Sequence, residues 1–404
     1  MTEKLFYQDS YLAVFEAEVL SCVPKGEHYE AVLSRTAFFP EGGGQKADSG
    51  RLKAGEITAK VLDVQEKEGK IYHFLNRPLP VGSLVEGKLD YEQRFSRMQQ
   101  HTGEHIISGI VNRRFGYHNV GFHLGDQQVT MDYDGVLSQT DLQEIEWEAN
   151  RAVAENIPVR VLYPDSHELE KITYRSKIEI EGQIRIVQIP GYDSCACCAP
   201  HVKETGSIGL IKITGAIHYK GGMRVSMLCG FRALEDYRQK QESVQQISNQ
   251  LSVKQEEVWT GVCRLEEELL AQKEKNKQLQ QKYVEACLKE TAKDLEEHPE
   301  KCLLLFDQEL DSQAMRSFVN QAMDMSQGIC GAFCGTEEEG YRYILAGRNL
   351  DIQALGRRLN KSFQGRGGGR PPMIQGSLIG KEEDIREFFR MEEGEYLTGT
   401  EERI

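Results

Sequence analysis

The chain has 404 residues and a formal net charge of −14 at pH 7, with 39% hydrophobic and 28% charged residues. These values predict a globular protein of two or three domains and exclude one that binds nucleic acid through its overall charge, because backbone neutralisation needs clustered Lys and Arg. No apolar run approaches the roughly 20 residues of a membrane helix, and the N-terminus carries no secretion or transit pattern. We therefore expect a cytoplasmic protein with no membrane partner.

Residues 1–90 predict a small β-barrel, because short alternating segments are separated by glycine, proline and charged turns. The expected strands are 13–19, 29–33, 59–64 and 70–74. A glycine-rich stretch between them contains Thr36 and then Gly42, Gly43, Gly44 and Gln45. Successive glycines permit backbone conformations closed to other residues and let a ligand approach closely, although a flexible turn is the simplest interpretation of the triplet alone.

Residues 91–234 change to helix–strand units, which predict an α+β layer with one helix pair packed on an antiparallel sheet. The expected helices are 98–111 and 143–156, and the expected strands are 159–162, 184–189, 209–213 and 223–228.

Two short motifs in this region predict a metal site. His101 and His105 are four residues apart in the first helix, so their imidazoles share one face. Cys197 and His201, between two predicted strands, add a thiolate and a third imidazole. Three histidines and one cysteine form a donor set suited to a single tetrahedral zinc ion.

Each motif also has a simpler interpretation. A histidine pair at this spacing is often a helix-surface or core feature. The cysteine cluster, which also holds Cys195 and Cys198, would be a disulfide remnant in an oxidising compartment. The remaining seven of the ten cysteines are scattered and do not form a disulfide framework.

Residues 235–296 are rich in Gln, Glu and Lys and predict a helical linker, either a coiled coil or a helical hairpin. Apolar residues recur at a spacing near 3.5, with polar breaks at Lys254, Gln272 and Asn276. A solvated single helix is the alternative.

Residues 297–404 predict a compact α/β domain. The expected strands are 302–306, 328–334 and 341–346, and the expected helices are 311–325 and 352–363. A Gly- and Arg-rich stretch follows at 365–376, and the window 356–370 holds five cations, including Arg366 and Arg370, with no acid. Backbone amides and guanidinium groups together suit phosphates, although a loop with merely solvated arginines would have the same composition.

At the histidine and cysteine motifs the chain resembles the alanyl-tRNA synthetase editing domain and its free-standing relatives, the AlaX proteins. The family's HxxxH and CxxxH zinc motifs match at His101, His105, Cys197 and His201, and the resemblance extends through 201–209 and 224–234. It implies that Thr36 recognises the serine hydroxyl of a mischarged substrate and that the glycine-rich loop lies beside the editing pocket. Residues 297–404 resemble the DHHA1 domain, and nearly the whole chain resembles the long form of AlaX.

The resemblance implies a trans-editing hydrolase for tRNA(Ala) charged with serine or glycine. Thr36 and Gln45 are its catalytic candidates, the three glycines with Arg366 and Arg370 its substrate-binding candidates, and one zinc per chain its cofactor. A homodimer through the C-terminal half is expected. No GxxxxGK[ST] motif is present, so ATP is not expected to be used.

Two other functions fit parts of the sequence. A non-catalytic tRNA-binding adaptor would use the zinc structurally, and a zinc hydrolase would act on another ester. Four protein ligands fill a tetrahedral shell, so either one ligand is labile, the metal expands its coordination, or the metal organises the pocket while another group positions water.

Overall fold

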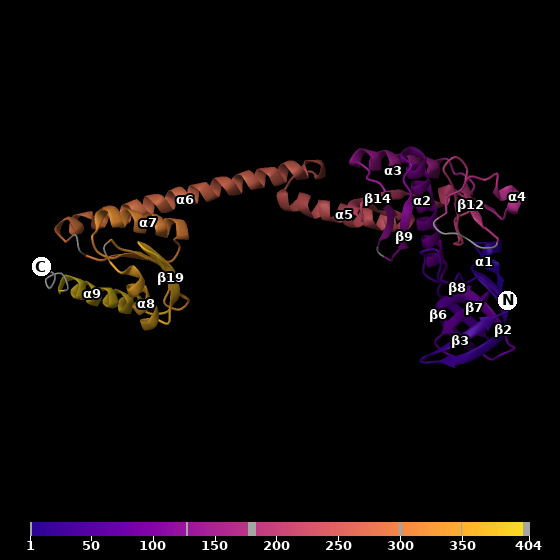
Figure 1. Cartoon of the computed structure of the whole chain (residues 1–404), viewed down its shortest axis with the longest axis horizontal. Helices are drawn as coiled ribbons and strands as arrows, with labels where there is room; N and C mark the ends of the chain where they lie inside the picture. The colour runs from indigo at the N-terminus through magenta and orange to yellow at the C-terminus, as the bar shows by residue number, and fades with distance from the viewer. Residues whose placement is uncertain (1, 127, 177–182, 299–300, 349, 399–404) are drawn as a thin grey trace. The chain divides into compact units, whose positions relative to one another are not determined.

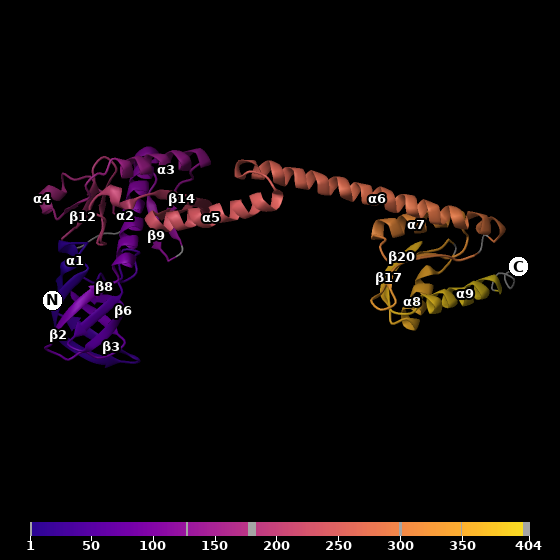
Figure 2. The ribbon, with the colours of Figure 1, turned by 180° about the vertical axis from the view of Figure 1, so that it is seen from behind.

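The structure is a computed structural model that describes residues 2–126, 128–176, 183–298, 301–348 and 350–398. It divides into two compact units, Met1–Gln246 and Ile247–Ile404, each of which is described by itself (Figures 1 and 2). The boundary falls within helix α5 (Gly230–Leu251). Among the described residues, no helix combines the length and the apolar composition that a bilayer crossing needs.

The first unit begins with the closed barrel that the alternating segments predict. Its strand order is β2-β3-β7-β6-β5-β8. The strands are β2 (Val14–Lys25), β3 (His28–Leu33), β5 (Gly50–Ala54), β6 (Ile57–Lys67), β7 (Lys70–Leu75) and β8 (Leu84–Leu89). Inward side chains such as Leu52 and Ala59 are fully buried, whereas their neighbours in sequence are exposed. The sequence had indicated four of these strands and had missed β5 and β8.

Two short strands, β1 (Glu3–Lys4) and β4 (Arg35–Thr36), pair in parallel outside the closed barrel, and the short helix α1 (Leu5–Gln8) lies between them in sequence.

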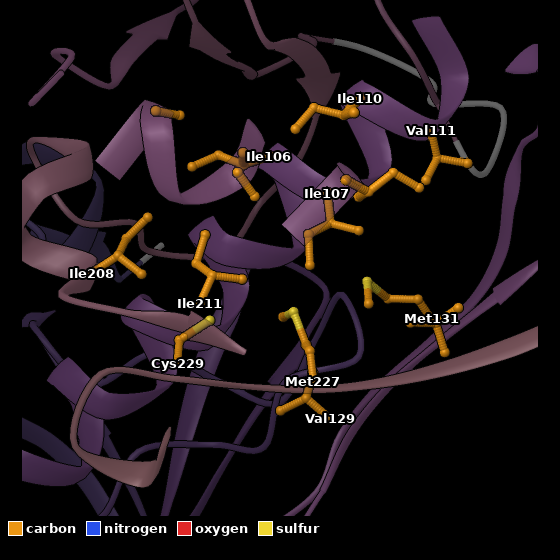
Figure 3. Packing of buried hydrophobic residues seen from close by; sticks show 14 of the residues in the cluster. Ile106, Ile107, Ile110, Val111, Val129, Met131, Ile208, Ile211, Met227 and Cys229 are labelled. Atoms are coloured by element: carbon orange, nitrogen blue, oxygen red, sulfur yellow. The ribbon is translucent and has the colours of Figure 1, made fainter. Parts of the chain in front are cut away.

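The second layer is an antiparallel sheet covered by two helices, and the expected strands 209–213 and 223–228 lie in it, whereas the expected strands 159–162 and 184–189 belong to a separate three-stranded sheet. The sheet order is β14-β15-β10-β9. The strands are β9 (Asn119–Leu124), β10 (Val129–Tyr133), β14 (Ile211–Tyr219) and β15 (Gly222–Cys229), and the helices are α2 (Tyr91–Phe115) and α3 (Gln139–Ala154). Figure 3 shows α2 residues packed against the sheet in the core. Every residue of α2 from Met98 to Val111 is buried, so this helix is enclosed on all sides.

A three-stranded sheet brings the cysteine cluster to α2. Its strands are β11 (Arg160–Leu162), β12 (Ile186–Ile189) and β13 (Asp193–Ala196), with α4 (Ser166–Leu169) between β11 and β12 and the turn η1 (Thr205–Ile208) after β13. A Cβ atom at Gly109 of α2 would lie 2.3 Å from the carbonyl oxygen of Tyr192. Glycine at this position therefore allows the chain entering β13 to contact the helix backbone directly.

The second unit contains a five-stranded sheet between two helix layers. Its order is β16-β17-β18-β20-β19, with β16 and β17 parallel and the other pairs antiparallel. The strands are β16 (Leu303–Asp307), β17 (Cys330–Thr336), β18 (Gly340–Ala346), β19 (Arg366–Arg370) and β20 (Met373–Leu378). Helices α6 (Val258–Glu297) and α7 (Ser312–Met325) cover one face, and α8 (Ile352–Ser362) and α9 (Glu382–Thr398) cover the other.

Two alternatives that the sequence left open for this unit are excluded. The Gly- and Arg-rich stretch is not a loop but the hairpin β19–β20, whose first strand is fully exposed at the sheet edge. Residues 252–254 separate α5 from α6, with the short turn η2 (Gln255–Glu257) between them, so the linker is not one continuous helix. Leu265 and Leu279 of α6 are 54% and 55% exposed. A coiled-coil partner for this stripe stays a prediction.

A buried ion pair joins α2 to the barrel region. Arg94 is 1% exposed, and its Nε donates to Oδ2 of Asp48 at 2.8 Å. The same guanidinium donates to the carbonyl oxygen of Ala37 at 2.6 Å, and Oδ2 of Asp48 accepts from the amide of Phe39 at 2.7 Å. Arg97 lies 3.9 Å from the other oxygen of this carboxylate, but within the described residues Arg94 is the cation that hydrogen-bonds to it, so removing Arg94 would leave a desolvated charge poorly compensated.

We expect Arg94→Met to lower the free energy of unfolding of the first unit by about 3–5 kcal/mol, because it removes the hydrogen-bonded cation of a buried carboxylate and leaves only Arg97, at 3.9 Å, beside it. Urea denaturation followed by circular dichroism measures the loss. Arg114→Met on the same helix removes an exposed ion pair with Glu144 and is the matched control, with an expected loss below about 1 kcal/mol. Equal losses in the two variants would contradict the anchoring role of Arg94.

Candidate metal site

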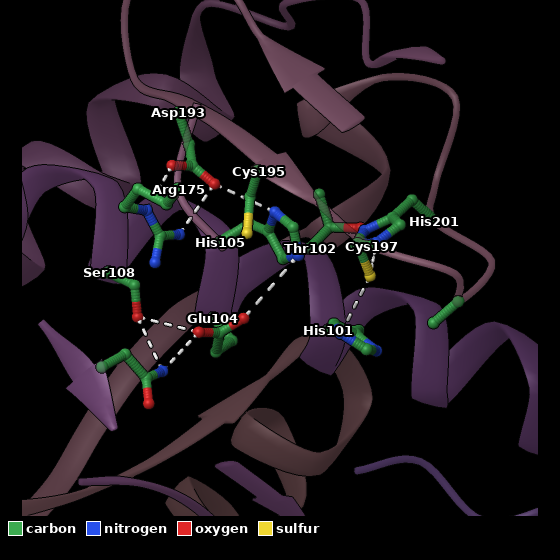
Figure 4. Close-up of polar contacts among 12 residues, drawn as sticks. His101, Thr102, Glu104, His105, Ser108, Arg175, Asp193, Cys195, Cys197 and His201 are labelled. Atoms are coloured by element: carbon green, nitrogen blue, oxygen red, sulfur yellow. Dashed lines mark hydrogen bonds and ion pairs between the residues drawn. The ribbon is translucent and has the colours of Figure 1, made fainter. Parts of the chain in front are cut away.

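The four predicted ligands meet between α2 and the segment that follows β13. Sγ of Cys197 lies 3.6 Å from Nε2 of His101 and 3.4 Å from Nε2 of His201. One ligand atom from each of these residues and from His105 lies within 4.8 Å of all the others. Figure 4 shows the three imidazoles and the thiol facing one another.

The outer nitrogen of two of the imidazoles is held by a hydrogen-bond acceptor. Nδ1 of His101 lies 3.1 Å from Oε1 of Gln45, which only accepts. Nδ1 of His201 lies 3.0 Å from Oγ1 of Thr102, and that hydroxyl donates its own hydrogen to the carbonyl oxygen of Met98 at 2.8 Å. Both rings therefore carry their proton on Nδ1 and turn the lone pair of Nε2 toward the thiol, which is the tautomer that a metal-ligating histidine needs.

The third imidazole is held by a carboxylate. Nδ1 of His105 lies 3.0 Å from Oδ2 of Asp193, and Arg175 binds both oxygens of that carboxylate at 2.8 and 2.9 Å. Burial by itself raises the pKa of Asp193, but the hydrogen bonds from His105 and Arg175 outweigh it and hold the pKa below its usual value. The carboxylate therefore stays ionised beside the ring and fixes its orientation.

Burial shifts the pKa values of Cys197 and His201 in opposite directions, and in both cases it favours the neutral form. Burial raises the pKa of Cys197, so its thiolate needs a nearby positive charge. Burial also lowers the pKa of His201 well below its usual value, which keeps that ring neutral and able to donate a lone pair. These tendencies, together with the oriented nitrogens, fit a bound zinc ion, whose charge would stabilise the thiolate.

The other two cysteines of the cluster lie elsewhere. Cys195 is buried on β13, where its thiol, with His105 and Asp193, forms a second group of metal-type donors. Cys198 is exposed, and a Cβ atom at Gly43 would lie 3.3 Å from its sulfur. Geometry thus favours Cys197 as the ligand, because it alone contacts two of the imidazoles in the described residues.

The predicted glycine-rich stretch forms a tight turn against β9. Gly42 and Gln45 exchange backbone hydrogen bonds of 3.0 and 3.1 Å, and Gly44 has a φ of +80°. A Cβ atom at Gly44 would lie 2.8 Å from Cδ1 of Phe122, and the carbonyl of Gly44 accepts from the amide of Leu124 at 3.1 Å. Glycine is therefore required here both for its conformation and for the close contact.

This turn aims the side chain of Gln45 at the histidines. Gln45 is 1% exposed, with Oε1 on His101. Within the described residues, its Nε2 amide is buried and has no hydrogen-bond partner. A buried donor in this state costs about 1–3 kcal/mol, so a molecule that enters the site and offers an oxygen would gain that hydrogen bond.

Thr36 has a different environment from the one that its expected role implies. It is fully buried, and its hydroxyl lies 2.9 Å from Nε2 of His73 and accepts from the amide of Phe38 at 3.1 Å. Nδ1 of His73 lies 3.2 Å from the carbonyl of Ala31, so Nε2 accepts and Thr36 donates. Both capacities of the hydroxyl are used inside the barrel region, and its role in substrate recognition stays a prediction.

Several supporting residues were not identified from the sequence. Thr102, Asp193 and Arg175 orient the imidazoles, and only the position of Asp193, two residues before Cys195, gave a signal. Glu104, by contrast, was a candidate from the sequence, together with Gln45, for polar assistance at the metal; it is buried, and its Oε1 accepts from Ser108 at 2.8 Å. Its Oε2 lies 3.8 Å from Nε2 of His105.

The two predicted arginines of the second unit lie on β19, and both are exposed. Arg358, from the same basic window, forms an ion pair with Glu392, so the window offers less net positive charge than its sequence indicates. Side chains alternate along a strand, which places Arg366 and Arg370 on one face of β19.

Comparison with known proteins places these features in a family. Residues 2–93 match the family model described as tRNA synthetases class II (A), and residues 184–266 match the one described as threonyl and alanyl tRNA synthetase second additional domain. The second match includes Asp193, Cys197 and His201.

Three relatives illustrate the similarity. The alanyl-tRNA editing protein AlaX-L of Pyrococcus horikoshii is 31% identical over 240 residues, 58% of this chain and 59% of that protein. The alanyl-tRNA editing protein Aarsd1 of Rattus norvegicus is 29% identical over 392 residues, 92% and 93% of the two chains. An alanine–tRNA ligase of Korarchaeum cryptofilum is 31% identical over 398 residues.

The chain spans 43% of the Korarchaeum ligase and 59% of the Pyrococcus protein, which is less than two thirds of either. The match to Aarsd1, by contrast, runs through nearly the whole of both chains. Through its two matched regions and these relatives, the chain is similar to the alanyl-tRNA synthetase editing domain and its free-standing relatives, which is the resemblance that the HxxxH and CxxxH motifs indicated.

Proposed function

We propose that the chain is a trans-editing hydrolase that cleaves the ester between tRNA(Ala) and a wrongly attached amino acid, chiefly serine and also glycine. The names of the AlaX-L and Aarsd1 relatives support an editing role. The observation that carries the proposal is the buried constellation of three oriented imidazoles, one thiol and the unpaired amide of Gln45.

The proposed preference for serine and glycine follows from the limited selectivity of an amino-acid pocket that accepts alanine. A pocket that accepts alanine cannot strongly reject the smaller glycine or a side chain that adds a hydroxyl, so a second hydrolytic site must remove these errors. A site that hydrogen-bonds the serine hydroxyl discriminates against alanine, because alanine leaves that site's polar group unpaired. Selectivity for serine therefore requires a buried polar group beside the ester.

Zinc is the proposed cofactor, held by His101, His105, Cys197 and His201. A zinc ion in such a site would supply positive charge to polarise an ester carbonyl or to lower the pKa of a water molecule to about 7. Four protein ligands complete a tetrahedral shell, so residues around the metal must help to position the ester and the attacking water.

We assign to Gln45 the role of hydrogen-bond donor to the carbonyl oxygen of the ester. Its Oε1 keeps Nδ1 of His101 protonated, and its Nε2 remains to donate to the carbonyl oxygen of the substrate. Negative charge develops on that oxygen as the ester is attacked, so a fixed donor there stabilises the transition state more than the ground state. The glycine turn supports this role by holding the Gln45 backbone against β9.

We assign Arg366 and Arg370 to tRNA phosphates. They are exposed on one edge strand, whereas Arg358 of the same window is bound to Glu392. The same half of the chain is the proposed dimer surface, because α6 exposes apolar side chains at heptad-like spacing.

The proposed activity is tested with a substrate panel of Ser-, Gly- and Ala-tRNA(Ala), with deacylation followed by release of the labelled amino acid. We expect rapid hydrolysis of Ser-tRNA(Ala), slower hydrolysis of Gly-tRNA(Ala) and little of Ala-tRNA(Ala). Gln45→Glu keeps an acceptor for His101 but removes the donor, and should lower kcat by about 100-fold. A chain that binds charged tRNA but hydrolyses none of the three would be an adaptor, and one that cleaves only simple esters would be another hydrolase.

We also expect one zinc per chain in the purified protein, and loss of that zinc in Cys197→Ser. Cys198→Ser, which changes the neighbouring exposed thiol, is the matched control and should retain the metal. Elemental analysis of the three proteins measures the stoichiometry. Retention of zinc in Cys197→Ser with loss in Cys198→Ser would move the ligand assignment by one residue.

Thr36→Val should narrow the ratio of kcat/KM between Ser-tRNA(Ala) and Ala-tRNA(Ala) and should also lower stability by about 1–3 kcal/mol. The valine leaves the buried amide of Phe38 without its acceptor and His73 without its donor. Thr36→Ser keeps the hydroxyl and should preserve both properties. A folded Thr36→Val protein with an unchanged ratio would remove Thr36 from the account of specificity.

A further inference from the structure

The outer face of the barrel carries three cations side by side on neighbouring strands. In the strand register, Arg51 of β5 lies directly opposite Lys60 of β6 on one side and directly opposite Lys88 of β8 on the other. We call these three residues the basic row. All three side chains are exposed, and among the described residues none of them forms an ion pair. Figure 1 shows β6 and β8 in this barrel.

This arrangement costs stability in the protein alone. Opposite residues on adjacent antiparallel strands have Cβ atoms about 5 Å apart, and like charges at this distance destabilise the sheet. Elsewhere on β5 and β8 opposite charges face each other, since Lys53 lies opposite Glu86. The basic row is therefore a local excess of positive charge in a chain whose net charge is −14.

The basic row lines a groove that offers room for a ligand. The groove measures about 670 Å³ and is bounded by the ends of β5, β6 and β8 and by the start of α2. Its acidic residues are Asp90 and Glu92, at the N-cap and in the first turn of α2, where the helix dipole favours negative charge. The cations lie on the strands that line the same groove, and Lys88 precedes Asp90 by two residues.

The groove also lies close to the metal site along the chain. Arg51 follows Gln45 by six residues, so their Cα atoms are at most about 22 Å apart. Tyr91, which lines the groove, precedes His101 by ten residues of one helix, a rise of about 15 Å. A polynucleotide whose end lies at Gln45 and His101 can reach the groove within a few nucleotides.

We propose that the basic row is an interaction surface for the phosphodiester backbone of RNA and that it holds the strand that leads to the editing site. This inference rests on the proposed function, since it takes the charged tRNA as the RNA. Three cations in a row of about 10 Å match a run of successive phosphates, and bound phosphates would relieve the mutual repulsion of the cations. The barrel then contributes to tRNA affinity independently of Arg366 and Arg370.

The test is the full-length triple variant Arg51→Gln, Lys60→Gln, Lys88→Gln. Filter binding of uncharged tRNA(Ala) over a salt series should show affinity lower by about tenfold or more, and a slope of log affinity against log salt reduced by about 2 to 3, near one unit per lost contact. Unchanged affinity and slope would overturn the proposal.

A second triple variant, Lys25→Gln, Lys53→Gln, Lys67→Gln, removes the same charge from exposed barrel positions outside the basic row. It should leave both affinity and slope close to wild type. A loss of affinity equal to that of the first triple variant would show a general charge effect and would overturn the assignment to the basic row.

Thermal unfolding separates binding from a structural role. Removing like charges that lie opposite each other should leave Tm unchanged or raise it. A lower Tm together with weaker binding would give the basic row a structural role and overturn the proposal. Hydrolysis of a seryl ester of adenosine, too short to reach the groove, should be equal in the wild type and the variant.

Different outcomes would contradict the hydrolase activity and the RNA binding of the basic row. If the wild-type chain binds tRNA(Ala) but does not deacylate Ser-tRNA(Ala), the proposed function is wrong. The affinity of the first triple variant for tRNA(Ala) still tests whether the basic row binds RNA. If deacylation occurs and the first triple variant binds like wild type, only the assignment of the basic row fails.

Discussion

The enclosure of α2 is the constraint on which the site depends. A helix that is buried from Met98 to Val111 must have neighbours on every side, and glycines at two positions let them approach. A Cβ atom at Gly103 would lie 2.4 Å from the sulfur of Cys229, and Gly109 similarly admits the chain before β13. At both glycines the neighbouring segment lies directly against the helix backbone. This close packing resists small shifts of the surrounding strands and holds the imidazoles on α2 in place.

The same enclosure forces every polar group on α2 to find a partner. Buried imidazoles, a buried carboxylate and a buried hydroxyl each cost free energy unless they are hydrogen-bonded. Besides contacts within α2, the partners come from other segments: Gln45 from the barrel region, Asp193 from β13 and Asn119 from β9. The constellation is thus a joint product of segments distant in sequence, which makes it rigid and makes its geometry dependent on the complete first unit.

Sequence patterns predicted what local spacing encodes. The i,i+4 histidines had to share a helix face, and the CxxxH spacing had to bring a thiol near an imidazole, so the four candidate ligands were identified before their distances were known. The barrel was indicated by period-two alternation, which is a local consequence of strand geometry. The histidine-bearing helix α2 was indicated by its spacing, but β9, β10 and β13 after it were not recognised from the sequence.

The remaining features depend on contacts that spacing does not encode. Nothing in the sequence indicates that the hydroxyl of Thr36 meets His73, which lies 37 residues later and fills the same interior. The Gly- and Arg-rich stretch has a loop-like composition, yet β19 pairs with β20 because main-chain hydrogen bonds need no side chains. Helix α8 contacts this strand, and Nε2 of Gln353 donates to the carbonyl of Gly369 at 2.8 Å. Composition therefore indicated the exposed cations Arg366 and Arg370 but not the strand on which they lie.

Net charge and local charge carry different information in this molecule. A total of −14 describes the long-range field, which in salt decays over about 10 Å, whereas three cations in adjacent register interact within that distance. The basic row was invisible in the sequence because Arg51, Lys60 and Lys88 are separated by 9 and 28 residues, and only the register of β5 with both neighbours brings them together. A sheet can thus concentrate charge that a scan along the chain disperses, so an acidic chain can still present a surface that attracts phosphates.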